Sequence, residues 1–221
     1  MRYMYLLRHG ETQWNVERRM QGRMDSPLTE LGKDQAGVHG ALLKRLGGVE
    51  RLWVSPSGRT SETAHIVNSH VHARIEYVDE LVERDCGEWA GMTLDEVEDK
   101  YGHEWMQLHA DPYWTAPPEG ESLQDMLMRV NGFLDGLFDE QWSSIGLVTH
   151  GVMSRVVLKF FLNLDELECA GLRHPNDLLY RLTFDEQGIE THHYLDGGAA
   201  QSGLHRPVSV ESATVISRDS E

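Results

Sequence analysis

The chain has 221 residues, a length that favours one large domain with enough apolar sequence to form a core. Its formal net charge of −16 disfavours nucleic acids and anionic membranes as partners, because both attract basic surfaces. The two cysteines, Cys86 and Cys169, are too few for a disulfide framework, and no apolar run is long enough for a membrane helix, so we expect a cytoplasmic protein.

Short apolar runs alternate along the chain with amphipathic stretches, a pattern typical of an α/β fold. We expect strands at residues 3–7, 51–55, 75–78, 145–149 and 179–184, with a weaker edge strand at 190–194. We expect helices at about 29–46, 60–69, 94–108 and 152–161, and the clearest helix after Gly120. There Ser122 and Asp125 can form a capping box before a stripe of apolar residues that runs to Phe138. The sequence therefore predicts a single α/β domain over residues 1–196, with a mostly parallel central sheet and helices on both of its faces.

Two segments depart from this alternation. Residues 91–120 combine a helical pattern with a proline-containing loop, which predicts a helical lid insertion over the end of the sheet. Substrate selectivity would then reside in that insertion. Residues 197–221 lack periodicity and predict a flexible C-terminal tail.

The first segment with chemical potential follows the strand at 3–7 and reads Leu7-Arg8-His9-Gly10-Glu11-Thr12. Ligands bind in α/β folds at the carboxyl ends of the strands, and Gly10 permits close approach of the backbone to a bound group. Arg8 can bind phosphate oxygens and His9 can act as a nucleophile. A lone histidine here would be an incidental turn residue, but the whole string favours a site.

Two further segments share this design. Thr149-His150-Gly151 again places a histidine and a glycine directly after an apolar strand, at a helix start that favours anions. The alternative for His150 is an ordinary core or cap histidine. Arg59 follows the strand at 51–55 and lies in the first turn of the next helix. A cation is unfavourable near the positive end of a helix dipole, and a phosphate bound there would offset this repulsion. Its alternative is a surface arginine paired with Glu62.

The fourth segment, residues 81–91, is glycine-punctuated and rich in carboxylates. One of these could be the general acid that transfer of a phosphoryl group from a poor leaving group requires. The residue types alone leave the choice open among Glu80, Glu83, Asp85 and Glu88.

Together these segments resemble the histidine phosphatase superfamily, which includes cofactor-dependent phosphoglycerate mutases, fructose-bisphosphatase relatives and small-molecule phosphatases. The resemblance covers residues 3–195, with the motifs in the family's order. Beyond the segments above it includes Asn15, Gln21-Gly22, Leu28-Thr29-x-x-Gly32 and Gly120-Glu121-Ser122. Four dispersed motifs agree, so an accidental match is disfavoured.

The resemblance implies a role for each matching residue. His9 resembles the residue that is phosphorylated, and Glu83 resembles the proton donor, because it holds the glutamate position of a Leu-x-Glu-x-x-x-Gly-x-Trp-x-Gly string. The implied substrate-binding residues are Arg8, Asn15, Gln21, Gly22, Arg59, His150 and Gly151. Two departures from the family's pattern, at Cys86 and Ala90, remove no catalytic group but could alter the pocket wall.

The implied function is hydrolysis of a small phosphorylated metabolite through a phosphohistidine, with no metal or other cofactor. A phosphoglycerate mutase is the alternative, but such mutases usually carry more basic residues after the Glu83 region, and Lys100 is the only lysine or arginine between 89 and 121. A catalytically silent phospho-ligand-binding protein ranks third, because His9 and Glu83 are both present. The expected partner is a small-molecule phosphate ester, and both a monomer and a homodimer are compatible with the sequence.

Overall fold

A seven-stranded sheet forms the centre of the computed structural model, which describes residues 1–206. The strands are β1 (Arg2–Arg8), β2 (Arg51–Val54), β3 (Arg74–Tyr77), β4 (Ser144–Thr149), β5 (Leu178–Asp185), β6 (Gly188–Leu195) and β7 (Gln201–Ser202). They lie in the order β3-β2-β4-β1-β5-β6-β7. Strands β3, β2, β4 and β1 are parallel neighbours, and the remaining strands continue antiparallel. The sheet is thus mixed and parallel at its centre, and the predicted α/β class is confirmed.

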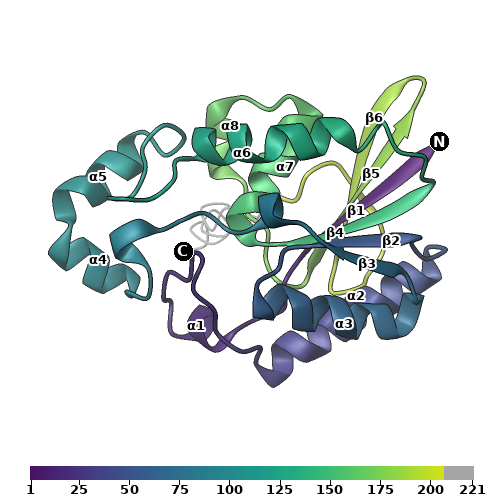
Figure 1. Ribbon diagram of the computed structural model, residues 1–221, viewed down its shortest axis with the longest axis horizontal. Helices are drawn as coiled ribbons and strands as arrows, with labels where there is room; N and C mark the ends of the chain where they lie inside the picture. Colours follow the sequence, from purple (N-terminus) through teal and green to yellow (C-terminus); the bar gives the residue numbers. More distant parts are fainter. Residues whose placement is uncertain (207–221) are drawn as a thin grey trace, which may run out of the picture.

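Helices cover both faces of this sheet. In Figure 1, α2 (Glu30–Arg45) and α3 (Gly58–Val71) lie on one face, and α6 (Leu123–Gly136), α7 (Gly151–Leu162) and α8 (Glu166–Gly171) lie on the other. The remaining helices are α1 (Gln13–Val16), α4 (Leu94–Lys100) and α5 (Gly102–Ala110), and short 3-10 turns occur at Asp79–Leu81 and Gly87–Trp89. None of the helices described within residues 1–206 has the length and apolar character to cross a membrane.

Strand β1 is buried on both faces, which fixes where its last residue lies. Met4 and Leu6 pack in the cluster formed with α6 and α7, whereas Tyr5 and Leu7 pack in the cluster formed with α2 and α3. Successive side chains of a strand point to opposite faces, so an unbroken apolar run suits a strand between two helical layers. The segment that follows β1 therefore starts from a rigid position.

Helix α6 forms as its sequence predicts. The backbone N–H of Asp125 donates to the Ser122 hydroxyl at 3.1 Å, and the Ser122 N–H donates to the Asp125 carboxylate at 2.9 Å. This capping box satisfies donors that would otherwise be unpaired at the first turn. The helix ends at Gly136, so Leu137 and Phe138 lie beyond it.

The single helix expected at 94–108 is wrong in detail, because the chain forms α4 and α5 with a break at Tyr101. Tyr101 has φ −124° and ψ 35°, outside the helical region, and Gly102 begins the next helix. Trp105 and Leu108 pack with Trp89 around a small separate core. Figure 1 shows α4 and α5 set apart from the sheet, beyond the edge at which β1 ends.

The expectation of a flexible tail from residue 197 is corrected at Gln201–Ser202, which form a strand. Strand β7 pairs antiparallel with β6, with His193 opposite Gln201, and the Nδ1 atom of His193 lies 2.8 Å from the Gly203 carbonyl oxygen. Backbone pairing, which requires no hydrophobic periodicity, holds this short strand on the sheet edge. The part of the expectation that concerns residues 207–221 lies outside the described residues.

Candidate active site

The parallel strands β1, β2 and β4 end at one edge of the sheet and bring distant polar residues together. Arg8 is in register with Thr149, and Val54 is in register with Val148. The residues that follow these strands therefore meet, as the strand-end rule for α/β folds predicts. The ring centroids of His9 and His150 lie 5.3 Å apart, with an angle of 64° between the ring planes.

His9 is held with one ring nitrogen available for chemistry. Its Nδ1 atom lies 2.8 Å from the Gly10 carbonyl oxygen, which can only accept, so Nδ1 carries the proton and Nε2 has a free lone pair in the neutral ring. Burial, together with the positive charges of Arg8 and Arg59, holds the pKa of His9 well below its ordinary value. His9 is thus a neutral imidazole with a nucleophilic nitrogen at neutral pH.

Gly10 is required here by close packing. A Cβ atom at Gly10 would lie 2.1 Å from the backbone oxygen of Gly32, and one at Gly32 would lie 2.1 Å from the oxygen of Glu11. The turn after β1 therefore packs directly on the first turn of α2, where Thr29 caps the helix by accepting from the Gly32 N–H. The expected importance of Gly10 has this physical basis.

His150 lies against His9 and is fully buried. Its Nε2 atom lies 2.7 Å from the Ser55 hydroxyl, and its Nδ1 atom is buried without a hydrogen-bond partner among the described residues. Burial and the charge of Arg59 hold the pKa of His150 well below its ordinary value. Because a buried nitrogen without a partner is costly, Nδ1 is a natural place for an additional polar contact.

Arg59 is buried rather than on the surface, so the alternative of a surface pair with Glu62 is wrong. Its side chain is 1% exposed and donates to the carbonyl oxygens of Gly22 at 2.8 Å and Met24 at 2.7 Å. It also pairs with Asp25 at 2.9 Å. The guanidinium therefore ties the segment around Gly22 to the start of α3 while contributing positive charge to the site.

Arg8 enters the site from β1. Its Nη1 atom donates to the His174 carbonyl oxygen at 2.8 Å, and its Nε atom is buried without a partner among residues 1–206. Next to it, a Cβ atom at Gly151 would lie 3.2 Å from the Arg8 guanidinium carbon, so the lack of a side chain at Gly151 leaves room for Arg8. The sequence did not indicate His174 as a support for Arg8.

Glu83 sits at the N-terminus of α7. Its two carboxylate oxygens accept from the backbone N–H groups of Val152 and Met153, each at 3.1 Å, and from that of Arg84 at 2.9 Å. The other three open choices, Glu80, Asp85 and Glu88, do not line the cavity that contains His9 and Glu83. The positive end of the α7 dipole thus holds the Glu83 carboxyl group in place.

A cavity of about 140 Å³, which we call the His9 cavity, collects most of these side chains. Of the residues predicted from the sequence it is lined by Arg8, His9, Asn15, Gln21, Gly22, Arg59 and Glu83. Its lining also includes Arg84, which the sequence did not single out, and Cys86, one of the two departures from the family's pattern. His150 and Gly151 do not line this cavity: the His150 ring contacts that of His9, and Gly151 lines a neighbouring cavity with Arg8.

A further side chain reaches the site without any sequence signal. The side-chain amide of Asn176 donates to the His9 carbonyl oxygen at 2.7 Å, across 167 residues of chain. It holds the backbone of His9 from the side opposite the Thr149 carbonyl, which accepts the His9 N–H at 3.0 Å. His9 is thereby fixed by both its backbone groups and its ring.

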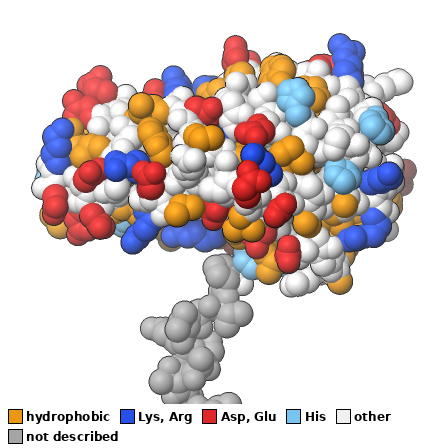
Figure 2. All heavy atoms as spheres, turned by 90° about the horizontal axis from the view of Figure 1, so that it is seen from below, with side chains coloured by type: hydrophobic (Ala, Val, Ile, Leu, Met, Phe, Trp, Pro, Cys, Tyr) orange, Lys and Arg blue, Asp and Glu red, His pale blue; other side chains and the backbone are white. Residues whose placement is uncertain are grey.

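The site is positively charged within an acidic molecule. Arg8, Arg59 and Arg84 all line the His9 cavity, although Asp and Glu outnumber Lys and Arg by 36 to 20 in the whole chain. On the face shown in Figure 2, acidic and basic side chains are interspersed rather than gathered into one field. No group of three or more His, Cys, Asp or Glu side chains suited to a metal ion occurs within residues 1–206. A nucleophilic imidazole, clustered guanidiniums and a carboxyl group suit transfer of an anionic group.

Comparison with known proteins points to one family. Residues 4–197 match the model of the histidine phosphatase superfamily (branch 1). The chain is 35% identical over 187 residues to the "probable phosphoglycerate mutase GpmB" of Shigella boydii serotype 18, an alignment that covers 84% of this chain and 86% of that protein. Among solved structures, Bacillus stearothermophilus YhfR is 30% identical with a TM-score of 0.78, covering 90% of this chain and 98% of that one. A mycobacterial glucosyl-3-phosphoglycerate phosphatase is 25% identical with a TM-score of 0.77, covering 90% and 100%.

Proposed function

The chain belongs to the histidine phosphatase superfamily (branch 1), and from this premise we propose that it hydrolyses a small phosphorylated metabolite through a phosphohistidine on His9, with Glu83 as the proton donor. The observation that carries the proposal is the state of His9. Its Nε2 atom is the free nitrogen of a neutral ring in a cavity lined by Arg8, Arg59 and Glu83.

The reaction takes place in two transfers. In the first, the lone pair of His9 Nε2 forms a bond to phosphorus while the bond from phosphorus to the ester oxygen breaks, and Glu83 gives its proton to that oxygen. In the second, Glu83 takes a proton from a water molecule whose oxygen attacks phosphorus. The nitrogen–phosphorus bond breaks, inorganic phosphate is released, and neutral His9 is restored.

The arginines stabilise the transferring group. Charge spreads over the three equatorial oxygens of the phosphoryl group, so fixed cations lower the transition-state energy more than they lower that of the free ester. Each charge-assisted contact contributes about 1.5–3 kcal/mol. Loss of Arg8 or Arg59 is therefore expected to reduce the rate by about one to two orders of magnitude, at about 1.4 kcal/mol per tenfold.

The buried Nδ1 atom of His150 supports a role in binding as well. It lies beside His9 and has no protein partner among the described residues, so an oxygen of the phosphoryl group is a suitable acceptor for it. If Nε2 donated to Ser55 while Nδ1 donated to the phosphoryl oxygen, the ring would have to carry a proton on each nitrogen. In the neutral ring, the Ser55 hydroxyl instead donates to Nε2 and Nδ1 carries the proton.

A phosphoglycerate mutase is the second candidate, supported by the 35% identity to a protein of that name. A mutase returns the phosphoryl group from the histidine to a bound intermediate, whereas a phosphatase gives it to water. Incubation of the enzyme with a phosphoglycerate, with and without a bisphosphate primer, separates the two. Inorganic phosphate as the main product supports hydrolysis, and primer-dependent formation of the isomer supports the mutase.

Trapping of the intermediate tests the catalytic proposal. Wild-type protein is mixed with a ³²P-labelled phosphate monoester and quenched, and the label is expected on protein as an acid-labile, alkali-stable adduct at His9. The His9→Ala variant should lose both the adduct and phosphate release. His65→Ala, which removes an exposed histidine of α3, is the matched control and should retain both. Phosphate release by His9→Ala at the wild-type rate would contradict the proposal, and an absence of turnover in the wild type would favour a silent binding protein.

A further inference from the structure

A second cavity, of about 320 Å³, adjoins the His9 cavity and is here called the Trp105 cavity. The two cavities share Met20, Arg84 and Val152 in their linings, so they are contiguous. On the side of the 91–120 segment the wall of the Trp105 cavity is formed by the apolar residues Trp105, Leu108 and Pro112 together with His109.

Three guanidiniums line the Trp105 cavity. They come from separate parts of the chain: Arg84 follows Glu83, Arg155 belongs to α7, and Arg173 follows α8. No Asp or Glu stands among the described residues that line this cavity. Like charges gathered in this way repel one another, so the group lacks a counter-charge that an anion would supply.

Two of these arginines carry a buried nitrogen that has no hydrogen-bond partner among the described residues. Arg84 is 8% exposed, and the Nε atoms of Arg84 and Arg155 are both buried with no partner within residues 1–206. Buried guanidiniums are normally paired, because leaving a charged donor unsatisfied costs free energy. Burial and the neighbouring Arg173 lower the pKa of Arg155 to about 10, and the attraction of the Glu83 carboxylate offsets only part of this shift.

A purely structural role accounts for only part of the hydrogen-bonding capacity of Arg155. Its Nη1 atom donates to the Ala170 carbonyl oxygen at 3.2 Å, near the end of α8, where a cation is favourable. That contact uses one of the five N–H donors of the side chain. No other hydrogen bond joins its guanidinium to the described residues, and its Nε atom is buried without a partner.

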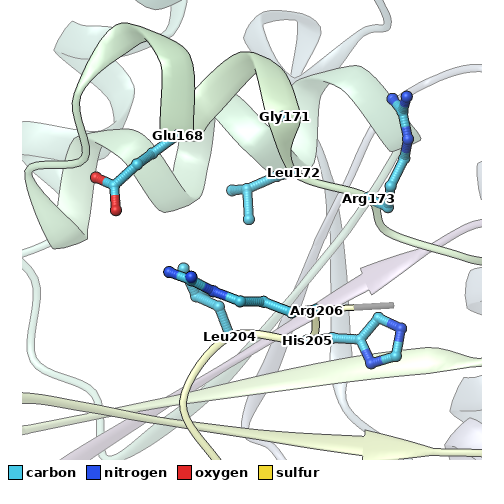
Figure 3. Close-up of a pocket in the computed structure, with 7 residues that line it drawn as sticks. All are labelled: Glu168, Gly171, Leu172, Arg173, Leu204, His205 and Arg206. Atoms are coloured by element: carbon cyan, nitrogen blue, oxygen red, sulfur yellow. The ribbon is translucent and has the colours of Figure 1, made fainter. Parts of the chain in front are cut away.

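Arg173 forms no salt bridge with a carboxylate within residues 1–206. It shares a neighbouring hollow with Glu168, yet Figure 3 shows its guanidinium pointing away from both Glu168 and Arg206. It lines the Trp105 cavity together with Arg155, whose pKa the charge of Arg173 helps to lower. An anion between Arg155 and Arg173 would be attracted to both and would reduce their mutual repulsion.

From this arrangement we propose that the leaving group of the substrate carries a second anion, a carboxylate or a phosphate, which binds in the Trp105 cavity between Arg155 and Arg173, with Arg84 placed between the two anions. The inference rests on the proposed function, because it assumes that the ester phosphate occupies the His9 cavity. The apolar wall at Trp105 and Leu108 would contact the carbon skeleton that joins the two anions.

The size of the Trp105 cavity suits a small-molecule substrate. A volume of about 320 Å³ lies within the range typical of small-molecule sites, and it exceeds the 140 Å³ of the His9 cavity. Although residues 89–121 contain few basic side chains, the leaving group can still be charged. The cations that line this cavity come from the loop after Glu83, from α7 and from the segment after α8 instead.

Three phosphate monoesters on the same six-carbon chain test the inference. Hexyl phosphate has no second charge, 6-(phosphonooxy)hexanoate ends in a carboxylate, and hexane-1,6-diyl bisphosphate ends in a phosphate. Release of inorganic phosphate gives kcat/KM for each with the wild type, Arg155→Gln, Arg173→Gln and Arg74→Gln. Arg74 is an exposed arginine of β3 and serves as the matched control.

The wild type is expected to prefer at least one charged ester over hexyl phosphate by about tenfold or more. Arg155→Gln and Arg173→Gln should reduce that preference several-fold, whereas Arg74→Gln should keep it. Arg173 is exposed, so its variant keeps the test valid even if Arg155→Gln fails to fold. Equal kcat/KM for all three esters, or a preference that survives both substitutions, would overturn the inference and leave the phosphatase activity standing. Failure of the wild type to hydrolyse any ester, or hydrolysis by His9→Ala, would overturn the proposed function and the inference with it.

Discussion

The Ser55 hydroxyl and the Nε2 atom of His150 lie 2.7 Å apart, across 95 residues of chain. The contact joins the residue after β2 to the residue after β4, which are neighbouring parallel strands. Both side chains are fully buried, so water does not compete for the bond. The orientation of the His150 ring beside His9 is thus set by the sheet rather than by a mobile surface loop.

Ser55→Ala should loosen this ring and leave Nε2 unpaired. We expect a loss of about 1–3 kcal/mol in the free energy of unfolding, because a buried acceptor would lose its donor. We also expect kcat/KM for a phosphate ester to fall by about tenfold, since the contact from Nδ1 would be less well placed. Urea denaturation and steady-state kinetics measure the two effects. Ser57→Ala is the control, because the Ser57 side chain makes no capping hydrogen bond at the start of α3; equal losses in both variants would argue against the role of Ser55.

Glu83→Gln should affect substrates according to their leaving groups. The amide keeps the shape of the side chain but cannot supply the proton, so an alkyl phosphate should lose about 10²–10⁴-fold in kcat. The aryl ester 4-nitrophenyl phosphate, whose leaving group needs no proton, should lose far less in the step that forms the phosphohistidine. Burst kinetics on both esters measure this difference.

Glu88→Gln is the matched control for that experiment. Its carboxylate accepts from the Tyr101 hydroxyl at 3.0 Å and does not line the His9 cavity. Both esters should react with Glu88→Gln at nearly the wild-type rate. An identical loss for the alkyl and aryl esters in Glu83→Gln would assign Glu83 to binding or folding instead of proton transfer.

Gly10→Ala and Gly37→Ala should change stability in opposite directions. The added methyl at Gly10 would lie 2.1 Å from the Gly32 oxygen, and such overpacking costs about 1–3 kcal/mol. At Gly37, inside α2, an added Cβ meets nothing within 4 Å, so alanine should stabilise the helix by about 0.5–1 kcal/mol. Urea midpoints measure both changes, and a Gly10→Ala protein as stable as the wild type would mean that the turn after β1 can move away from α2.

The candidate catalytic cluster could be predicted from the sequence because its members share local patterns. His9 and His150 each follow an apolar strand and precede a glycine, and Arg59 follows a third strand. Parallel neighbours bring such positions to one edge. The choice of Glu83 from four carboxylates needed the family resemblance, because only the position of α7 distinguishes it physically.

Other parts of the site had no local pattern to indicate them. Asn176 and His174 support the site from an irregular segment before β5, and Arg155 and Arg173 meet only because α7 and α8 pack together. The break at Tyr101 was missed because a helical pattern continues through it, and the small core around Trp89 depends on tertiary contacts. Side chains that depend on packing between separate elements are beyond what periodicity can predict.

Stability should fall as the pH drops below about 6.5, because buried histidines are neutral in the folded state. Burial lowers the pKa of His39 to about 4 and that of His174 to about 3. In the unfolded chain these groups take up protons near pH 6.5, so between that pH and the folded pKa the unfolded state binds more protons. Each histidine should therefore lower the free energy of unfolding by about 1.4 kcal/mol for every pH unit in that window.

His39→Leu isolates one of these contributions. The side chain is 1% exposed, and replacing it with leucine removes its proton uptake on unfolding. Between pH 6 and 4.5, the slope of unfolding free energy against pH, measured by urea denaturation, should become shallower by about 1.4 kcal/mol per unit. His65→Leu, at an exposed position of α3, should leave the slope close to that of the wild type. A His39→Leu slope identical to the wild-type slope would mean that His39 already binds its proton in the folded protein, and that the acid sensitivity arises from other groups.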